Sequence, residues 1–510
     1  MLAKVGSAAV IGIEAVSIEV EVDSGNVGDL RAVIVGLPDA AVRESLDRVF
    51  SAMTHSGFQV PFGRTTVNLA PADVRKEGPS FDLPIAVGIV QASDQMSSQI
   101  LSDYLMVGEL ALTGAVRHVK GALAIALRAR TEGRVGVLVP VDNAAEASVV
   151  EGLDVIPISN LREAVAFLEG EQSILPIRTD LTALFTHIDE EADDFSEVKG
   201  QESVKRALEI AAAGGHNVLL IGPPGTGKSM LAKRLPGILP PLTLAEALEA
   251  TQIHSTVGLL SKNQPLLTRR PFRSPHHTAS DAGLLGGSVN PTPGEISLAH
   301  HGVLFLDELP EFKRSVLETL RQPLEEGHVT ISRASGTMTF PAQFMLVAAM
   351  NPTPDGKMPS ESRSSPRAIQ NYLGRVSGPL LDRIDLHVEV PALEFHQLTA
   401  KGPLGESSAE IRQRVMLARG IQTQRFAARP RVTCNARMGT RDLRVHCALD
   451  EHTYEMMKLA MADLKLSARA YDRILRVART IADLAGVDRV ESEHVFEAIQ
   501  FRSLDRQLWT

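Results

Sequence analysis

The sequence contains few residues of the kinds that mark secreted or membrane proteins. It has 2 cysteines in 510 residues, which is too few for a disulfide framework and is typical of a protein in the reducing cytosol. Aromatic residues make up only 4% of the chain, so its hydrophobic cores must be mainly aliphatic. No apolar run approaches the length that crosses a bilayer. We therefore expect a cytoplasmic protein without a membrane partner.

The sequence also lacks a surplus of basic residues. Lys and Arg number 52 against 61 Asp and Glu, which gives a formal net charge of −9. This balance argues against a protein that coats nucleic acid along its whole surface, but it leaves room for a local basic channel. The length suits about three domains, and 44% hydrophobic with 22% charged residues is ordinary for a globular protein.

A glycine-rich segment stands between an apolar run, residues 217–221, and a helical pattern, residues 229–235. It is a complete G-x-x-x-x-G-K-[ST] phosphate loop made of Gly222, Pro223, Pro224, Gly225, Thr226, Gly227, Lys228 and Ser229. A strand, a glycine loop and a helix in this order point backbone N–H groups at one spot, which binds phosphate. We expect Lys228 to reach the β- and γ-phosphates of ATP and Ser229 to ligate Mg²⁺.

A second apolar strand, residues 303–306, is followed by two acids, Asp307 and Glu308. Asp307 at the strand end can hold the Mg²⁺ shell, and Glu308 can polarise the attacking water. Taken alone, the pair would more simply be two surface acids at a strand end. Downstream of a phosphate loop, it predicts the other half of a nucleotide-hydrolysing site.

The chain divides into blocks with different patterns. Residues 1–168 alternate β-rich and helical runs, and residues 169–197 form an acidic linker. Residues 198–393 hold the nucleotide motifs in an α/β pattern, and residues 407–510 are helical. The sequence therefore predicts an α/β protein with three folded parts and one connector.

Four further segments complete an order that resembles AAA+ ATPases. Residues 198–201 lie where those proteins hold the adenine, and Asn351 ends an apolar strand at the place of sensor 1. Arg383 occupies the place of the arginine finger, and Arg469 opens a helix at the place of sensor 2. The resemblance implies a P-loop NTPase core with a C-terminal helical lid.

The resemblance also implies a catalytic role for each of these three polar residues. Asn351 would align the attacking water together with Glu308. Arg383 would offer its charge to the phosphate of a neighbouring subunit, and Arg469 would do so in cis. Arg383 could instead form a surface ion pair with an adjacent aspartate, and a nearby arginine on the same helix could take the place of Arg469.

Two other segments narrow the family. Residues 270–278 (Arg-Pro-Phe-Arg-Ser-Pro-His-His-Thr) and 293–300 are similar to the magnesium-chelatase branch of AAA+. With residues 67–73 (Val-Asn-Leu-Ala-Pro-Ala-Asp), they make nearly the whole chain resemble the ComM/YifB family of magnesium-chelatase-like competence ATPases. The resemblance implies a homohexamer that uses ATP and Mg²⁺ to drive branch migration of DNA.

Two rival functions remain at this point. One is a protein-remodelling ATPase, for instance a motor subunit that serves magnesium insertion into a porphyrin. The other is a regulatory ATP-binding scaffold with negligible turnover, and an intact Glu308 argues against it.

The N-terminal block resembles the proteolytic domain of Lon, an α+β fold of the ribosomal S5 domain 2-like type. Ser80 stands where Lon has its nucleophile, but Leu123 stands where Lon has its lysine base. Lys120 is offset from that position by three residues, and a leucine cannot take the hydroxyl proton. We therefore expect a Lon-like domain without peptidase activity.

The loop after Asn351 departs from the family pattern. Relatives often carry two C-x-C pairs there, which suggest a metal knuckle, whereas the matching positions here are Thr353, Asp355, Ser362 and Ser364. None of these supplies a thiolate, so we expect no zinc. The loop 353–367 must be ordered in some other way or not at all.

Two pairs of adjacent histidines, at 276–277 and 300–301, invite a metal interpretation. Adjacent side chains point to different sides of a strand or helix, and no H-x-x-x-H or C-x-x-C accompanies them. We expect structural or subunit-interface roles for both pairs.

Two basic features are candidates for DNA contact. Residues 329–340 alternate around a small polar tip, which predicts a hairpin, and Arg333 near that tip could contact DNA phosphate. An ordinary surface hairpin is the alternative. The second feature is a run of nine arginines, which suits either a nucleic-acid face or solvated helices. They are Arg412, Arg414, Arg419, Arg425, Arg429, Arg431, Arg437, Arg441 and Arg444.

Overall fold

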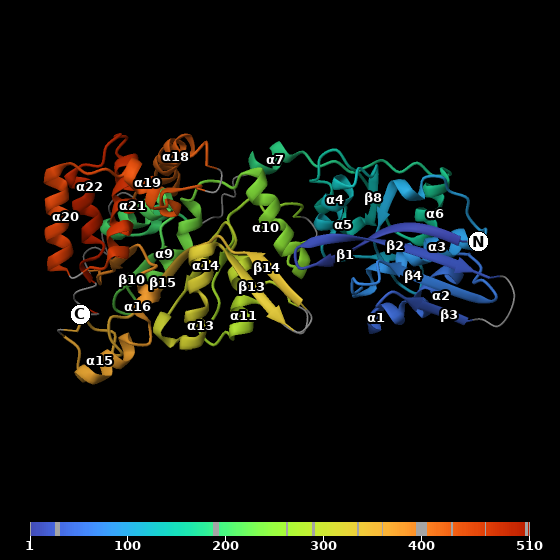
Figure 1. Cartoon of the computed structure of the whole chain (residues 1–510), viewed down its shortest axis with the longest axis horizontal. Coiled ribbons are helices and arrows are strands. Elements are labelled where there is room, and N and C mark those ends of the chain that lie inside the picture. Colours follow the sequence, from blue (N-terminus) through green and yellow to red (C-terminus); the bar gives the residue numbers. More distant parts are fainter. Residues whose placement is uncertain are drawn as a thin grey trace. The chain divides into compact units, whose positions relative to one another are not determined.

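The structure is a computed structural model of the 510-residue chain (Figure 1). It describes residues 2–25, 31–186, 193–261, 264–287, 291–333, 336–359, 361–393, 405–429, 432–464, 466–504 and 508. The chain forms two compact units. Unit 1 comprises Met1–Ile188 and Leu244–Thr268, and unit 2 comprises Asp189–Thr243 and Arg269–Thr510. Most of the predicted acidic linker's charged run, 189–192, lies outside the described residues.

Unit 1 is built on a seven-stranded mixed sheet in the order β3-β4-β2-β1-β5-β8-β9. The β1–β2 and β2–β4 pairs are antiparallel, and the remaining pairs are parallel. A short antiparallel pair, β6 (Glu109–Leu110) and β7 (Val116–Arg117), lies outside this sheet. The seven strands are β1 (Leu2–Ile11), β2 (Glu14–Ser24), β3 (Arg31–Val35), β4 (Arg64–Ala70), β5 (Tyr104–Met106), β8 (Gly136–Pro140) and β9 (Asp154–Ile158).

The helices of unit 1 cover this sheet. Every residue of α3 from Leu83 to Val90 is buried, because the helix packs on β1 and β2 with an all-apolar surface. The helices are α1 (Ala40–Arg43), α2 (Ser45–His55), α3 (Asp82–Ala92), α4 (Ala122–Thr131), α5 (Val141–Ala147), α6 (Leu161–Glu169), α7 (Leu181–Thr186) and α10 (Leu244–Val257).

Helix α10 comes from the segment that the sequence pattern grouped with the ATPase core, yet it belongs to unit 1. Its buried residues Ala247, Ala250 and Ile253 form an apolar stripe, and it packs against α4. The Ser255 carbonyl accepts a hydrogen bond from Gly121 N at 3.3 Å. The place of α10 is decided by the packing of this stripe against α4. The sequence alone does not show which element the stripe packs against.

Unit 2 contains a five-stranded parallel sheet in the order β11-β12-β15-β10-β16. Every residue of β10, β12 and β15 is buried, as expected for central strands of a parallel sheet. These three strands are neighbours, so the residues that follow their carboxyl ends meet at one edge. The strands are β10 (Val218–Ile221), β11 (Phe272–Arg273), β12 (Val303–Leu306), β15 (Met345–Met350) and β16 (Leu386–Glu389).

Short helices and one hairpin complete the part of unit 2 around this sheet. The hairpin joins β13 (His328–Arg333) to β14 (Gly336–Pro341). The helices are α8 (Glu202–Gly214), α9 (Lys228–Arg234), α11 (Asp281–Leu285), α12 (Glu295–Leu298), α13 (Arg314–Thr319), α14 (Arg321–Glu326), α15 (Pro366–Leu373) and α16 (Gly378–Leu381).

The C-terminal part of unit 2 is helical, as the sequence predicts, and lies on one side of the unit while the hairpin lies on the other (Figure 1). Its longest members, α18 and α21, both pack on α8, and their apolar residues join the core under the sheet. The helices are α18 (Ser408–Arg425), α19 (Thr440–His446), α20 (Glu451–Asp463), α21 (Ala468–Leu484) and α22 (Ser492–Gln500). Among the described residues, no helix is both long and apolar enough to cross a membrane.

Candidate functional site

The glycine loop connects β10 to α9, the arrangement that the sequence predicts. Gly225 and Gly227 have φ values of +79° and +88°, a left-handed conformation that glycine adopts without strain. A Cβ added at Gly222 would lie 2.2 Å from the Val390 carbonyl oxygen, whereas one at Gly225 would meet nothing within 4 Å. The loop is therefore closely packed where it leaves the sheet and open where a phosphate would enter.

Lys228 lies at the start of α9 and is buried. Its Nζ donates to the carbonyl oxygens of Gly222 and Pro223, at 2.6 and 2.8 Å, and to Asn351 Oδ1 at 3.2 Å. Burial lowers the pKa of the Lys228 ammonium, and the charge of Asp307 opposes this effect. The structure thus brings the phosphate loop, Lys228 and Asn351 together.

Ser229 and Asp307 form the second contact of the site. Ser229 Oγ donates to Asp307 Oδ2 at 2.5 Å, and the other carboxylate oxygen accepts from Glu308 N at 2.9 Å. A hydroxyl and a carboxylate are the oxygen ligands that suit Mg²⁺, so this pair fits the expected ion. The open loop around Gly225 and the Lys228 ammonium fit a triphosphate in the same way.

Glu308 has a positive φ of 53° and an exposed side chain. His277 Nδ1 lies 3.2 Å from Glu308 Oε2, a contact that the sequence analysis did not anticipate. In the parallel pair β11–β12, Arg273 lies opposite Leu304. His277 lies four residues after Arg273, and Glu308 lies four residues after Leu304, so the register of the two strands brings them to the same edge. A hydrogen-bonded imidazole can orient the carboxylate that would polarise water.

Tyr372 of α15 is a second residue that sequence reasoning missed. It is buried and makes a hydrogen bond with the backbone of Asn351. Burial raises the pKa of Tyr372 to about 12, and the charge of Glu311 acts in the same direction. The phenol therefore stays protonated and supports the backbone beside Lys228.

Arg383 and Arg469 lie near each other, away from the phosphate loop. Arg383 is buried, its Nη1 donates to the Pro379 carbonyl at 2.6 Å, and its Nη2 pairs with Glu325. Arg469 is exposed, with Nη1 3.9 Å from Asp382 Oδ2. Burial lowers the pKa of Arg383, and the neighbouring positive charges, Arg469 among them, act in the same direction.

The sheet separates this arginine pair from the phosphate loop of the same chain. Asp385 N donates to the carbonyl of Asn217, which stands just before β10, whereas the loop follows the other end of that strand. Four strand residues span about 13 Å. Arg473 of α21 pairs with Asp385 at 2.5 Å and anchors the helix that carries Arg469 at this end. In this structure Arg469 therefore lies at the end of the sheet opposite the phosphate loop of its own chain.

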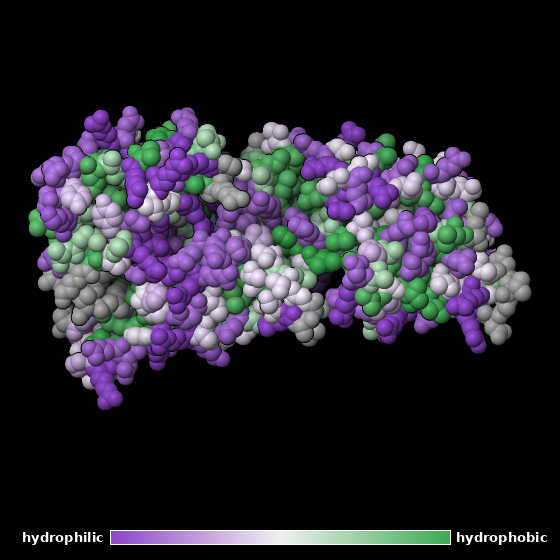
Figure 2. Space-filling model, viewed as in Figure 1, coloured by the Kyte–Doolittle hydropathy of each residue, from purple (hydrophilic) through white to green (hydrophobic). Residues whose placement is uncertain are grey.

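A cavity of about 300 Å³ opens beside these arginines. Its lining includes four cations, Arg437, Arg469, Arg473 and Arg476, and three acids, Glu325, Asp385 and Asp472. Among the residues that the structure describes, the Nε atoms of Arg383 and Arg476 are buried without a hydrogen-bond partner. Figure 2 shows hydrophilic residues gathered over α14, which carries Glu325.

The predicted hairpin is confirmed. Strands β13 and β14 pair from His328↔Pro341 to Arg333↔Gly336, with Val329, Ile331 and Phe340 buried. Arg333 is exposed beside the tip, and a Cβ added at Gly287 would lie 3.3 Å from its Nη2. Residues 334–335, at the predicted tip, lie outside the described residues.

Several side chains of the arginine-rich segment are already paired with other residues of unit 2. Arg414 pairs with Glu209 and Glu406, Arg425 with Asp483, and Arg429 with Asp442, while Arg419 donates to two backbone carbonyls. Arg431 lies outside the described residues. Four of the nine arginines therefore form contacts within unit 2, among the C-terminal helices and between them and α8, which favours the structural alternative for them.

The candidate peptidase positions in unit 1 are not arranged as a serine–lysine pair. Leu123 is fully buried, and its N–H donates to Glu146 Oε1 at 2.9 Å. Lys120 is exposed and packs beside Gly258. Ser80 lies in the turn before α3, where its carbonyl accepts from Gly108 N at 2.9 Å.

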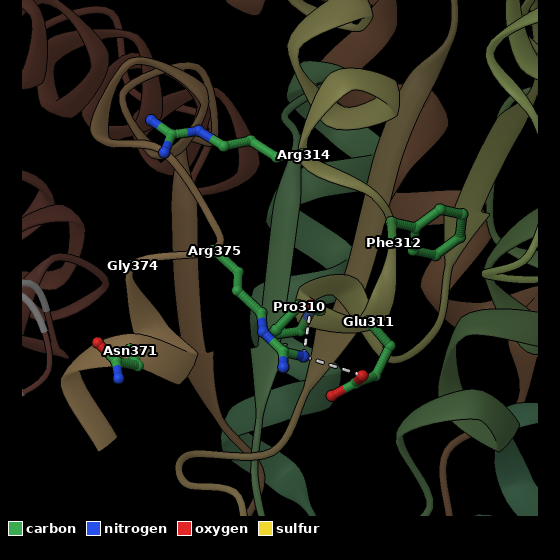
Figure 3. A pocket seen from close by; sticks show the side chains of 7 residues that line it. All are labelled: Pro310, Glu311, Phe312, Arg314, Asn371, Gly374 and Arg375. Carbon is green, nitrogen blue, oxygen red and sulfur yellow. Dashed lines mark hydrogen bonds and ion pairs between the residues drawn. The ribbon is translucent and has the colours of Figure 1, made fainter. Parts of the chain in front are cut away.

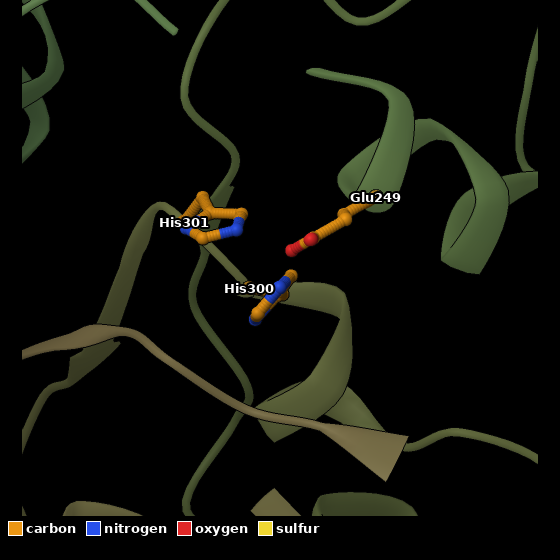
Figure 4. A group of neighbouring side chains, drawn as sticks. All are labelled: Glu249, His300 and His301. Carbon is orange, nitrogen blue, oxygen red and sulfur yellow. The ribbon is translucent and has the colours of Figure 1, made fainter. Parts of the chain in front are cut away.

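The second histidine pair has a backbone role. His300 Nδ1 accepts a hydrogen bond from Gln343 N at 3.0 Å, and His301 N donates to the Gln343 carbonyl at 2.6 Å. The two rings lie 3.8 Å apart (Figure 4). The imidazole of His300 and the backbone of His301 thus hold the chain just before β15.

Comparison with known proteins gives three matches in chain order. Residues 18–143 match the subunit ChlI of Mg-chelatase, residues 194–398 match magnesium chelatase subunit ChlI, and residues 405–502 match the C-terminal part of that subunit. Competence protein ComM of Haemophilus influenzae is 45% identical over 512 residues, which cover 99% of this chain and 98% of that protein. The chain belongs to the ComM/YifB family of magnesium-chelatase-like AAA+ ATPases.

Other relatives agree. YifB of Escherichia coli is also 45% identical over 512 residues, with 99% of this chain and 98% of that protein covered. The magnesium-chelatase 38 kDa subunit of Rhodobacter capsulatus is 27% identical over 215 residues, or 38% of this chain and 55% of that subunit. As a ComM/YifB protein, the chain is an ATPase of the competence-protein type, and its family uses ATP and Mg²⁺.

Proposed function

We propose that the protein is an ATP-driven DNA translocase that acts as a ring of identical subunits, six in number, and promotes branch migration. One observation carries the proposal: the nucleotide residues lie at one end of the unit 2 sheet, and the arginine pair Arg383 and Arg469 lies at the other. An ATP site that needs both groups is complete only where two copies meet.

Within one copy, each nucleotide residue has a separate task. The backbone N–H groups of the loop and Lys228 hold the phosphates, and Ser229 with Asp307 ligates Mg²⁺, which neutralises charge on the phosphate oxygens when bound. Glu308 polarises the attacking water, and Asn351 aligns it. The contacts of Lys228 with Asn351 and of Ser229 with Asp307 support this division.

Across the ring interface, Arg383 places positive charge against the phosphates held by a neighbouring copy. Arg469 lies beside it, so its role is revised from action in cis to action on the same neighbouring nucleotide. The excess of arginine around the 300 Å³ cavity supports an anionic occupant.

DNA as the substrate rests on the hairpin and on kinship. Arg333 is exposed near the hairpin tip, where it can contact phosphate without reading sequence. The name competence protein, carried by the Haemophilus influenzae relative, suits a protein that handles DNA.

For the remaining parts, we propose the division that the sequence predicts: a Lon-like domain at 1–168, a linker at 169–197, an ATPase core at 198–393 and a helical lid at 407–510. The first part has the ribosomal S5 domain 2-like α+β fold and no peptidase activity, since Leu123 is buried where a base is needed. The protein is cytoplasmic, has no membrane partner and holds no zinc.

The test is the ATPase rate of the purified chain alone, with single-stranded DNA and with a four-way junction. We expect both DNAs to raise the rate and the junction to be migrated in an ATP-dependent manner. If no DNA of any shape changes the rate, the DNA-translocase proposal fails, and the protein-remodelling function takes its place.

A further inference from the structure

The loop after Asn351 is closed by hydrogen bonds to one carboxylate. Asp355 Oδ1 lies 2.7 Å from Thr353 Oγ1 and 2.7 Å from Ser362 Oγ, and Asp355 Oδ2 accepts from Arg363 N at 2.9 Å. Ser362 Oγ in turn accepts from Ser364 N at 3.1 Å. We call this group, Thr353, Asp355, Ser362, Arg363 and Ser364, the Asp355 knot.

The knot joins the two ends of one loop. Thr353 is fully buried, and its Oγ1 also lies 2.6 Å from the Lys357 carbonyl oxygen, so its one proton is shared between two acceptors. Hydrogen bonds from Thr353, Ser362 and Arg363 N hold the pKa of Asp355 well below its usual range. The carboxylate is therefore ionised at neutral pH and accepts from residues on both sides of the loop.

The loop held in this way touches the phosphate loop. Gly356 has a φ of +80°, and its N–H donates to the Thr353 carbonyl at 3.0 Å. A Cβ added at Gly356 would lie 2.6 Å from Pro224 Cδ and 3.0 Å from Pro224 Cγ. The residue next to Asp355 is thus packed directly on the wall of the phosphate loop, where no side chain fits.

The chain beyond the knot returns to the same site twice. Tyr372 makes the hydrogen bond with Asn351 described above. Arg375 then donates to Glu311 Oε2 at 3.0 Å and lies 3.3 Å from the Pro310 carbonyl oxygen, three residues or fewer beyond Glu308 (Figure 3). One segment, 351–375, therefore touches the phosphate loop, the sensor asparagine and the strand end that carries the acids.

We propose that Asp355 is a positioning residue for ATP: by tying this loop shut, it holds Gly356 against Pro224 and keeps the phosphate loop in its binding conformation. These hydrogen bonds close the loop as a bound metal ion would, so the loop is ordered without an ion. The proposal depends only on the ATPase activity of the family and not on DNA as the substrate.

The test compares ATP affinity and turnover in Asp355→Ala, Asp355→Asn and the matched control Glu361→Ala, an exposed acid of the same loop. Asp355→Ala should raise the KM for ATP about 10-fold, the effect of losing one to two net hydrogen bonds, while kcat changes less. Asp355→Asn keeps one acceptor oxygen and should recover part of the affinity. Glu361→Ala should behave as the original protein.

Two further measurements separate positioning from general destabilisation. The Tm of all three variants should stay within about 2 °C of the original, because the substituted side chains, Asp355 and Glu361, are exposed. Gly356→Ala should raise the KM in the same direction, since its Cβ forces the loop away from Pro224. If Asp355→Ala fails to fold, Ser362→Ala removes a single donor and should raise the KM about threefold.

An unchanged KM in Asp355→Ala, or in Ser362→Ala where the first variant does not fold, would overturn the proposal. Equal effects of Asp355→Ala and Glu361→Ala would also contradict it. A failure of DNA to stimulate the original protein would refute the proposed function and leave this result standing.

Discussion

The two ends of the unit 2 sheet differ in how completely their charges are matched. At the carboxyl end, Lys228 bonds to the loop and Asn351, and Asp307 is bonded by Ser229 and the chain. At the amino end, arginines outnumber acids around the cavity, and the buried Nε atoms of Arg383 and Arg476 have no partner among the described residues. In the ring proposed above, the carboxyl end holds the nucleotide of its own copy and the amino end receives the phosphate of a neighbouring copy.

The proposed ring accounts for this difference, because the two groups of residues form one site only where two copies meet. The two groups lie at opposite ends of strand β10, whose four residues span about 13 Å. A small movement of the lid cannot bridge that distance, because Arg473 anchors α21 to the buried Asp385. Association of copies is the simplest way to bring them together.

The largest expected effect comes from the carboxyl end. Lys228→Ala should abolish ATP binding measured by calorimetry, because the only ammonium in contact with the phosphate loop is removed from the described site. Glu308→Gln should bind ATP normally and lose turnover, because its task is to polarise water. Equal ATP affinity in the Lys228→Ala variant and the original protein would contradict the phosphate-loop assignment.

Removal of Arg383 tests the amino end. Arg383→Ala should retain ATP binding but lose turnover by ~10³–10⁵, the effect of a missing arginine in related phosphoryl-transfer sites. Arg489→Ala, an exposed arginine elsewhere in unit 2, is the control. A fully active Arg383→Ala variant would show that the amino end plays no part in hydrolysis.

Substitution of Asp385 tests how much its buried ion pair with Arg473 stabilises the amino end of the sheet. Asp385→Ala leaves Arg473 without its buried partner and should lower the free energy of unfolding by about 3–5 kcal/mol. Burial alone would raise the pKa of Asp385, but Arg473 and His216 hold it well below the usual range. The stabilisation should therefore be fully present above about pH 4, begin to decline as the pH falls below that value, and disappear only as the pH passes the lowered pKa of the folded state. Urea unfolding at pH 7 and pH 3 measures both effects, and a variant whose stability loss is the same at both pH values counts against the pair.

The smallest expected effect concerns DNA. Arg333→Ala should weaken DNA binding about equally for all sequences and reduce the slope of log affinity against log salt by roughly 1 for each phosphate that Arg333 neutralises. Basal ATPase should persist, because the nucleotide residues are untouched. Fluorescence anisotropy at several salt concentrations measures the slope, with Arg489→Ala as the control, and an unchanged slope would remove the hairpin from the DNA path.

The residues at the nucleotide end could be predicted from the sequence because they lie in short motifs next to buried strands. The glycine loop, Asp307 and Asn351 each follow a strand, and parallel strands align their carboxyl ends. The contacts of His277 with Glu308 and of Tyr372 with Asn351 join residues about 20 to 30 positions apart, so no local pattern marks them.

The sequence also could not predict how the helices pack against the sheets. The amphipathic pattern of α21 predicts the helix but not the end of the sheet that it meets. The role of Arg469 at its own phosphate loop was implied by the resemblance to AAA+ ATPases and not by this pattern. The pattern of α10 likewise predicts a helix but not its place in unit 1. At position 355 the sequence shows only that an aspartate stands where relatives often have a cysteine. The hydrogen bonds of Asp355 with Thr353 and Ser362 depend on how the loop folds, which no local pattern predicts.

The most direct test of the central claim is to mix two inactive variants. Lys228→Ala subunits keep the arginine end, and Arg383→Ala subunits keep the nucleotide end, so an interface between them contains one complete site. With random mixing at equal amounts, about a quarter of the interfaces should be complete, and ATPase activity should recover toward that fraction. No recovery in rings shown by light scattering to contain both variants would contradict the account.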